Sequence, residues 1–410
     1  MHGYYVPTIR LVTRDPALLK RTLAAVAVSS SLVLAVPVAA HAVVSDKPTG
    51  ATPDFNGLVH TVVHRGDTVY AAGDFTSVRT TDGRQLARAG LAALSARTGQ
   101  VLRWAPKVDG SVANLAAAKD GVYLVGNFTT VNGYKRVDVA RVDPTTGAVD
   151  RAFKHSTNGV VNAVAMSKRK VYFGGQFTRF DGQRRGQLAA VSRKGESALR
   201  RWAPSSSEGQ VTDLVRKRSG VYVAGFFHHL NGTNRSFLAL VDSRRGAIVR
   251  SFRSRVPSVV LDISVTRKRV YAGTGGRYRG GGAVSVQRKD GSRVFHRRFD
   301  GDVQAITSMN GVVYAGGHFR SICKPGGEQT ESGSCVGGEE AMRYRGASLT
   351  GSGRLTGWDP KLNPNVTDIP GIEAFSRFSG QGRLLVGGGF TTANGEDAQR
   401  FAAFASVGGN

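Results

Sequence analysis

The stretch GVYLVGNFTTVNG, residues 121–133, decides the fold, because versions of it recur along most of the chain. Each version places Val-Tyr before a glycine-containing segment that ends in Phe, and successive versions begin about 50 residues apart. A self-similar unit of this length is typical of a propeller blade built from four short strands. The tyrosines of the repeat, with the leucine that replaces the last one, are Tyr70, Tyr123, Tyr172, Tyr222, Tyr271, Tyr314 and Leu385. Seven copies predict an all-β protein, a seven-bladed β-propeller.

The second copy shows how a repeat divides into the four-stranded antiparallel blade that we expect. Apolar and β-branched runs predict strands at 112–117, 122–128, 137–142 and 148–153. Turn signals separate these runs at Asp120-Gly121, Asn132-Gly133 and Thr146-Gly147. No part of the repeat region has a sustained 3.6-residue apolar period, so we expect few helices.

The two ends of the repeat region predict how the propeller closes. The last copy stops after its third strand, 401–407, and therefore lacks a fourth. At the front, residues 51–57 align with 104–110, which form the end of a fourth strand and the link beyond it. We expect the residues just before 51 to supply the missing outer strand of the last blade. This N-terminal strand exchange would cover an otherwise open sheet edge.

The pattern Gly-x-Phe-Thr-x-x-[Asn/Asp]-Gly, present at 126–133 and 175–182, resembles the repeats of bacterial delta-sixty-type β-propellers. The resemblance covers about residues 50–405. It implies the propeller fold, and it implies little about activity because that family is defined mostly by its repeat. The copy at Tyr271 departs from the pattern, since Thr274 and Gly276 replace the glycine and the phenylalanine.

The recurring Tyr, Gly and Phe are interpreted as structural, because one kind of residue in seven places does not mark a single active site. We expect the rings to pack between adjacent blades and the glycines to allow close backbone approach. Trp104, Trp202 and Trp358 end three of the expected outer strands and are also interpreted as packing residues. A sugar-stacking platform is the alternative use of these tryptophans.

Residues 1–42 have the three parts of a secretory signal peptide. A basic region that ends at Lys20-Arg21 precedes an apolar run, 22–38, and the cleavage pattern Ala40-His41-Ala42 follows. Pro37 makes the apolar run a poor membrane-spanning helix, so we expect cleavage, with a signal anchor as the alternative. The mature protein, 43–410, is then secreted or associated with the cell envelope and has no membrane span.

Cys323 and Cys335 are the only cysteines, and an even pair in an exported protein predicts one disulfide. Both lie in an insertion at 320–345, which also contains Glu328, Glu331, Glu339 and Glu340. Elaborated loops on a rigid scaffold often bind partners, so the insertion is a candidate contact for a protein partner. We expect it on the face opposite the basic turns described next. Decoration without a ligand is the alternative.

The formal net charge of +27 predicts attraction to polyanions, with solubility as the alternative explanation. The cations concentrate in two hairpin turns, strand one to two and strand three to four, of blades three, four and five. In an antiparallel blade both turns emerge on the same side, so one face would carry a basic sector. Its residues are Lys168, Arg169, Lys170, Arg193, Lys194, Arg216, Lys217, Arg218, Arg244, Arg245, Arg267, Lys268, Arg269, Arg288 and Lys289.

These features predict a secreted, non-enzymatic binding or scaffold protein whose basic face holds an anionic polymer of the cell envelope. No motif for sequence-specific nucleic-acid binding is present, and neither is one for a hydrolase nucleophile, a P-loop or a zinc enzyme. We therefore expect no catalytic residues, no cofactor and no metal.

The alternative interpretation is a propeller enzyme, a hydrolase, lyase or quinone-dependent oxidoreductase, with its site at the mouth of the central channel. Inward-facing acidic or histidine residues around the axis would favour it. A structural component with diffuse surface contacts is a third interpretation.

Overall fold

The structure is a computed structural model that describes residues 44–50, 52–195, 197–206, 208–276, 281–330, 333–366, 370–378 and 381–407. The expected signal peptide, 1–42, lies outside the described residues. The regular elements of the described part are β-strands, and no helix there is long and apolar enough to cross a membrane.

Eight antiparallel sheets of three or four strands are present among the described residues, and seven of them repeat one pattern and are numbered one to seven below. Sheets one to four are β2 (Val59–Arg65), β3 (Thr68–Gly73) and β6 (Leu91–Ser95); β7 (Ser111–Ala118), β8 (Gly121–Asn127) and β11 (Val139–Val142); β12 (Val161–Met166), β13 (Lys170–Gly175) and β16 (Leu188–Ser192); and β17 (Gln210–Lys217), β18 (Gly220–Phe226) and β21 (Leu238–Val241). Sheets five to seven are β22 (Val259–Val265), β23 (Arg269–Gly275), β24 (Gly282–Gln287) and β25 (Arg293–Arg298); β26 (Asp302–Met309), β27 (Val312–His318) and β32 (Gly346–Thr350); and β33 (Ile372–Phe378), β34 (Arg383–Gly388) and β37 (Phe401–Ala405).

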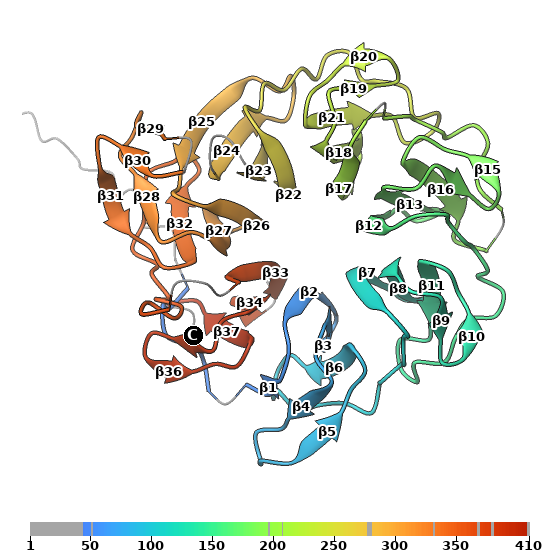
Figure 1. The fold of residues 1–410 in the computed structure, drawn as a ribbon, viewed down its shortest axis with the longest axis horizontal. Helices are drawn as coiled ribbons and strands as arrows, with labels where there is room; N and C mark the ends of the chain where they lie inside the picture. Colours follow the sequence, from blue (N-terminus) through green and yellow to red (C-terminus); the bar gives the residue numbers. More distant parts are fainter. Residues whose placement is uncertain are drawn as a thin grey trace, which may run out of the picture. The chain divides into compact units, whose positions relative to one another are not determined.

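The seven sheets follow one another in chain order around a common axis (Figure 1). The first strand of each sheet lies nearest the axis and packs against the first strands of the two neighbouring sheets. At the end of the series β33 packs against β2, so sheet seven lies beside sheet one.

The expected fourth strand is complete only in sheet five among the described residues. In four other sheets the corresponding segment joins its neighbour through one isolated bridge, at Val101, Val149, Ile248 and Leu355. The aromatic residue that ends the segment is buried between sheets. In sheet two, for example, Phe153 is fully buried four residues after the bridge at Val149.

Small hairpins connect the second and third strands and lie at the outer rim in Figure 1. In sheet one the hairpin strands are β4 (Ser77–Arg79) and β5 (Gln85–Ala87), and β1 (Asp54–Phe55) pairs with β4. The other hairpins are β9 (Thr130–Val131) and β10 (Tyr134–Lys135); β14 (Arg179–Phe180) and β15 (Gln183–Arg184); β19 (His229–Leu230) and β20 (Thr233–Asn234); β28 (Ser321–Cys323) and β31 (Glu339–Met342); β29 (Glu328–Gln329) and β30 (Cys335–Val336); and β35 (Thr392–Ala393) and β36 (Glu396–Asp397). The recurring Asn-Gly stands at the tips. Asn132 and Gly133 have φ of 49° and 77°, the left-handed pair that a type I′ turn requires.

The recurring glycine of the second strand lies opposite a β-bulge in the first strand. In sheet two the register of β7 on β8 shifts between Val112 and Asn114. A Cβ atom on Gly126 would stand 2.1 Å from the carbonyl oxygen of Ser111, so only glycine fits. The other six sheets have the same shift at the equivalent position. The expected role of the glycine, close backbone approach, is confirmed.

Aromatic pairs fill the spaces between sheets, as the repeat predicted. The Tyr123 ring meets the Phe153 ring edge-on at 5.3 Å between centroids, and Tyr70 meets Trp104 at 5.0 Å. Each pair belongs to a buried cluster that also contains residues of the next sheet. One of these clusters joins Leu385 of sheet seven to residues of sheet one. Hydrophobic burial therefore holds each sheet to its neighbours.

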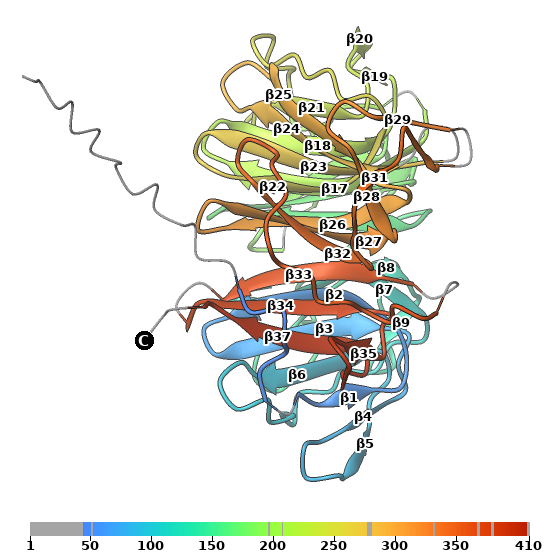
Figure 2. The ribbon, with the colours of Figure 1, turned by 90° about the vertical axis from the view of Figure 1, so that its left-hand side faces the viewer.

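The first described residues run along the outer edge of sheet seven (Figure 2). The backbone amides of Ser45 and Thr49 donate to the carbonyl oxygens of Ala405 and Ala403, each at 2.7 Å. The indole of Trp358 donates to the Ser45 carbonyl at 3.1 Å. A segment that precedes sheet one thus pairs with the last strand of sheet seven.

We predict that Gly126→Ala lowers the free energy of unfolding by about 3 kcal/mol, because the new methyl group would collide with the Ser111 carbonyl. Gly357→Ala is the matched control, since a Cβ atom there meets nothing within 4 Å, and it should change stability by less than about 0.5 kcal/mol. Urea unfolding of both variants measures the difference. Equal stabilities would contradict the role given to this glycine.

Candidate functional site

The two basic turns of a sheet lie on the same side of the molecule and touch each other. In sheet three the amide of Arg193 donates to the carbonyl of Arg169 at 3.0 Å, which joins the two turns. In sheet five the amide of Arg288 donates to the carbonyl of Lys268, also at 3.0 Å. The structure therefore brings together residues that are about 20 positions apart in the chain.

Nine of the fifteen cations of the basic sector are exposed. They are Lys168, Arg169, Lys194, Arg218, Arg244, Arg245, Arg267, Lys268 and Lys289. Their side chains make no hydrogen bond among the described residues. The one ion pair that any of them forms within the described residues is that of Lys289 with Asp290, at 3.9 Å, and the charge of Arg245 also acts on Asp242. This set, called the outer cations below, is a concentration of positive charge with almost no internal compensation.

The other six, Lys170, Arg193, Arg216, Lys217, Arg269 and Arg288, are half-buried, and several of them hold the sheets together. The Lys170 ammonium donates to the carbonyl of Ser243 at 2.9 Å, which ties sheet three to sheet four. Arg193 pairs with Asp120 of sheet two. Both cations are therefore engaged in contacts between sheets.

A groove of about 600 Å³ lies among the outer cations, between sheets five and six. Arg267, Lys268 and Arg269 line it on the side of sheet five. Gly311, Gly351 and Ser352 line the side of sheet six, so the opposing wall is formed by small residues. Such a groove gives an anionic chain room to lie against three cations.

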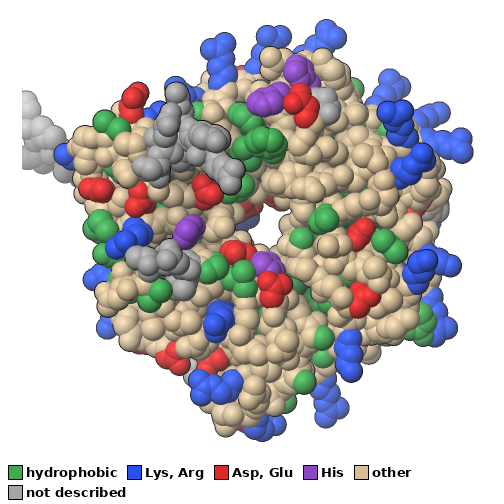
Figure 3. All heavy atoms as spheres, in the orientation of Figure 1, with side chains coloured by type: hydrophobic (Ala, Val, Ile, Leu, Met, Phe, Trp, Pro, Cys, Tyr) green, Lys and Arg blue, Asp and Glu red, His purple; other side chains and the backbone are tan. Residues whose placement is uncertain are grey.

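The seven bulges turn one residue of each first strand toward the axis, where they line a cavity of about 400 Å³. These residues are His60, Ala113, Asn162, Thr212, Leu261, Gln304 and Glu373. Figure 3 shows the central opening on one face, with acidic and histidine side chains close to it and most Lys and Arg side chains at the outer edge. The sequence analysis did not single out these residues. Their signal is the apolar-x-x-apolar spacing of each first strand, as in 59–62, which breaks strict alternation.

His60 lies between two carboxylates and links sheet one to sheet seven. Its Nδ1 is 2.6 Å from Glu373 Oε2, and its Nε2 is 2.8 Å from Asp74 Oδ2. Only the protonated ring can donate from both nitrogens. Burial lowers the pKa of His60, but the hydrogen bonds and charges of Glu373 and Asp74 outweigh burial and raise the pKa above the ordinary 6.5.

Asp213 and Asp262 occupy equivalent positions of neighbouring first strands, and their carboxyl groups influence each other's titration. Asp213 accepts from the amide of Ile263 at 3.1 Å, and Asp262 accepts from the amide of Ile306 at 2.7 Å. Each carboxyl therefore ties its strand to the next one. Burial raises the pKa of Asp213, while burial and the neighbouring charge of Asp213 raise the pKa of Asp262 well above its ordinary value.

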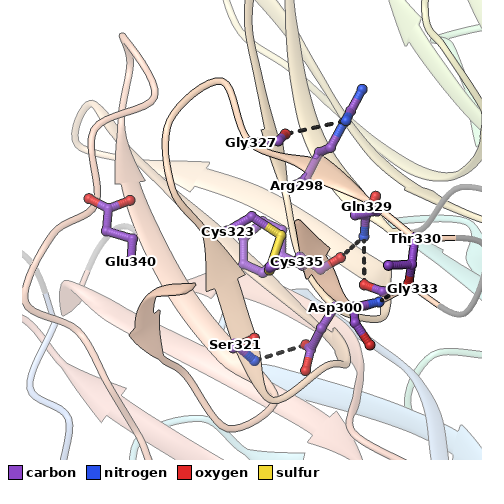
Figure 4. The surroundings of a disulfide bond; sticks show 12 residues. Arg298, Asp300, Ser321, Cys323, Gly327, Gln329, Thr330, Gly333, Cys335 and Glu340 are labelled. Carbon is purple, nitrogen blue, oxygen red and sulfur yellow. Dashed lines mark hydrogen bonds between the residues drawn. A yellow bond between two sulfur atoms is a disulfide. The ribbon is translucent and has the colours of Figure 1, made fainter. Parts of the chain in front are cut away.

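The predicted disulfide between Cys323 and Cys335 is confirmed (Figure 4), with Cα atoms 5.2 Å apart. The strands of the insertion lie at the outer rim, next to β25, rather than over the axis (Figure 1). Arg298 donates to the Gly327 carbonyl at 3.3 Å, and Gln329 donates to the Phe299 carbonyl. The insertion thus extends the outer edge between sheets five and six.

The adjacent histidines His228 and His229 have different partners. His229 lies 3.5 Å from Glu208, while the ring of His228 packs against Phe237. Within the described residues no group of three or more His, Cys, Asp or Glu side chains could hold a metal ion.

Comparison with known proteins identifies the fold. No family model and no curated protein matches the sequence. The chain is similar to the WD40 β-propeller domain of Doa1, with 12% identity and a TM-score of 0.54 over 90% of this chain and 98% of that one. The computationally designed Ika8 protein also aligns, with 12% identity and a TM-score of 0.49 over 86% of this chain and 98% of that one. At 12% identity the likeness to the Doa1 domain shows the fold alone: this chain is an all-β protein with the β-propeller fold.

We predict that His60→Gln destabilises the protein by about 1 kcal/mol near pH 6, because it removes the imidazolium between Glu373 and Asp74. Since the pKa of His60 is raised by folding, its stabilisation is complete below 6.5 and is lost as the pH rises through the folded-state pKa. The difference in Tm between wild type and variant should therefore narrow from about pH 6 to about pH 9. A difference that stays constant or widens with pH would contradict this assignment.

Proposed function

We propose that the protein is a seven-bladed, closed propeller that is exported and binds an anionic polymer of the cell envelope through its outer cations. The seven sheets in chain order, the packing of β33 on β2 and the pairing of Ser45 and Thr49 with β37 support the closed ring. In this arrangement residues 44–49 supply the outer strand that the last repeat lacks. The delta-sixty-type repeat pattern fits the same architecture.

The observation that carries the binding proposal is the set of nine exposed cations, which form a single ion pair among the described residues. Salt bridges within a protein normally offset such charges, and here the carboxylates of the same turns are engaged elsewhere. Asp242, for instance, accepts from the backbone amides of Arg244, Arg245 and Ala247, so it caps its own turn. The uncompensated charge attracts polyanions over long range.

A polymer fits this surface better than a small anion does. The outer cations extend over six turns of three sheets, and the groove at Arg267, Lys268 and Arg269 continues them toward sheet six. A small ligand would contact one turn, whereas a chain of negative charges contacts several at once. The disulfide supports an oxidising location, in keeping with the expected signal peptide. The exposed Val336 and Met342 of the insertion offer an apolar contact for a protein partner.

The channel offers the second candidate, an enzyme, because Asp213 and Asp262 form a carboxyl pair beside the axis. The hydrogen bonds favour a structural role for this pair. Both carboxyls already accept from backbone amides of the adjacent strand, and the insertion does not cover the channel. The outer cations have no comparable structural partners, so binding is the better-supported function.

We predict that the triple variant Lys168→Glu, Arg245→Glu and Lys268→Glu elutes from a heparin or teichoic-acid column at clearly lower salt than wild type. Each lost phosphate contact lowers the slope of log affinity against log salt by about one, so the slope should fall by about three. The measurement is the elution position, followed by binding titrations at several salt concentrations.

The matched control is Lys107→Glu, Lys154→Glu and Arg255→Glu, which makes the same change in net charge on exposed links between sheets. If retention depends on the outer cations, this control remains close to wild type. Equal losses in the two triple variants would show that net charge alone is responsible, and the proposal would fail.

A further inference from the structure

The channel continues beyond the bulge residues into a second cavity of about 480 Å³. Val62, Val215 and Asp262 line both cavities, so the two are contiguous along the axis. The second cavity is formed by the last residues of the first strands, just before the turns that carry the outer cations. It therefore opens on the basic face, at the centre of the ring of sheets.

Three basic side chains from three sheets line this cavity: His64 of β2, Lys217 of β17 and Arg377 of β33. Arg377 donates to the Ser308 carbonyl at 2.6 Å, and His64 is 2.9 Å from Ser376 Oγ. The described residues give Lys217 no ion pair and no side-chain hydrogen bond. No carboxylate forms an ion pair with any of the three in the described part of the chain.

The charge of Arg377 acts on the other two groups. Burial and the charge of Arg377 lower the pKa of His64, and burial followed by the charges of Arg377 and Arg288 lowers the pKa of Lys217. Burial lowers the pKa of Arg377 itself. Cations held together in a partly dehydrated cavity are costly unless an anion joins them.

Hydroxyl groups provide a second, independent observation. Ser264, Thr307 and Ser376 stand at equivalent positions of three consecutive first strands and line the same cavity. No hydrogen bond of the Ser264 or Thr307 hydroxyl to another described residue is present, so both hydroxyls are available to donate to a group in the cavity.

We propose that this cavity is a binding site for a small oxyanion group of the phosphate or sulfate class. Lys217 and Arg377 supply the charge, and the hydroxyls of Ser264 and Thr307 donate to the oxygens. Charge-assisted bonds from a guanidinium and an ammonium are the strong contacts that phosphate binding uses. Asp262 does not cancel the site, because its carboxyl accepts from the Ile306 amide and its raised pKa favours the neutral form.

This site is separate from the outer cations, so binding of a small oxyanion there can be tested independently of polymer binding. It differs from them in position, since it lies in the central channel, where residues of several sheets surround one anionic group. The ligand is either a free oxyanion or the phosphoester group of a larger molecule, and both present the same chemistry to the cavity.

The test is calorimetric titration of the full mature chain with inorganic phosphate and, separately, with glycerol phosphate, at low salt. We expect saturable binding of at least one probe, and the tighter probe identifies the source of the group. Lys217→Gln should weaken binding at least about tenfold, because it removes a charge that serves no other contact. Thr307→Val, which keeps the side-chain shape, should weaken binding about threefold or more.

Lys107→Gln, on an exposed link between sheets, is the control and should bind both probes as wild type does. Arg377→Gln is a further variant, to be judged only alongside its melting temperature because Arg377 also holds the Ser308 carbonyl. Absence of binding by the wild type up to about 10 mM of either probe would overturn the proposal. So would Lys217→Gln and Thr307→Val variants that bind as tightly as wild type.

Discussion

The close approach of two backbones at one recurring glycine is the constraint on which the structure depends. In every sheet the first strand bulges over the second, and at Gly126 the space is so narrow that a single methyl group would collide with Ser111. The bulge does two things at once. It lets the sheets pack closely around the axis, and it turns one additional side chain per sheet toward the channel. The repeat that builds the fold thus also lines its centre, and the seven bulge positions differ chemically while their backbones agree.

Recurring residues of the repeat also make the packing between sheets. A tyrosine of the second strand meets an aromatic residue that leaves the outer edge of its own sheet, and both enter a buried cluster with the next sheet. In several sheets the fourth segment pairs with the third strand through a single isolated bridge. The aromatic residue that follows this bridge is buried between the sheets. Polar groups of the first strands add specific links between neighbours, through His60 with Glu373 and through the amides that Asp213 and Asp262 accept.

Charge is distributed unevenly along the axis and across the faces. His60 and Glu373 lie at the starts of their strands, whereas His64, Lys217 and Arg377 lie at the ends that adjoin the basic turns. The carboxyl pair Asp213 and Asp262 stands between these groups. The outer cations extend the positive end of the channel over the surface, so a single face combines a basic surface with a basic cavity at the axis. This combination suits ligands that carry many negative charges or one concentrated charge.

The sequence by itself determined the repeat, the first three strands of the copies, the disulfide partners and the positions of the basic turns. Those features depend on local signals: the Val-Tyr runs, the Asn-Gly turns that become type I′ hairpins, and an even pair of cysteines. The tertiary structure decided which cations are exposed. It also decided which of them, like Lys170 and Arg193, form hydrogen bonds between sheets. It also decided the channel, because His60 and Glu373, or Lys217 and Arg377, are far apart in the chain and meet only when the sheets are arranged around one axis. Whether a side chain is partnered depends on its neighbours in space, and local sequence does not contain that information.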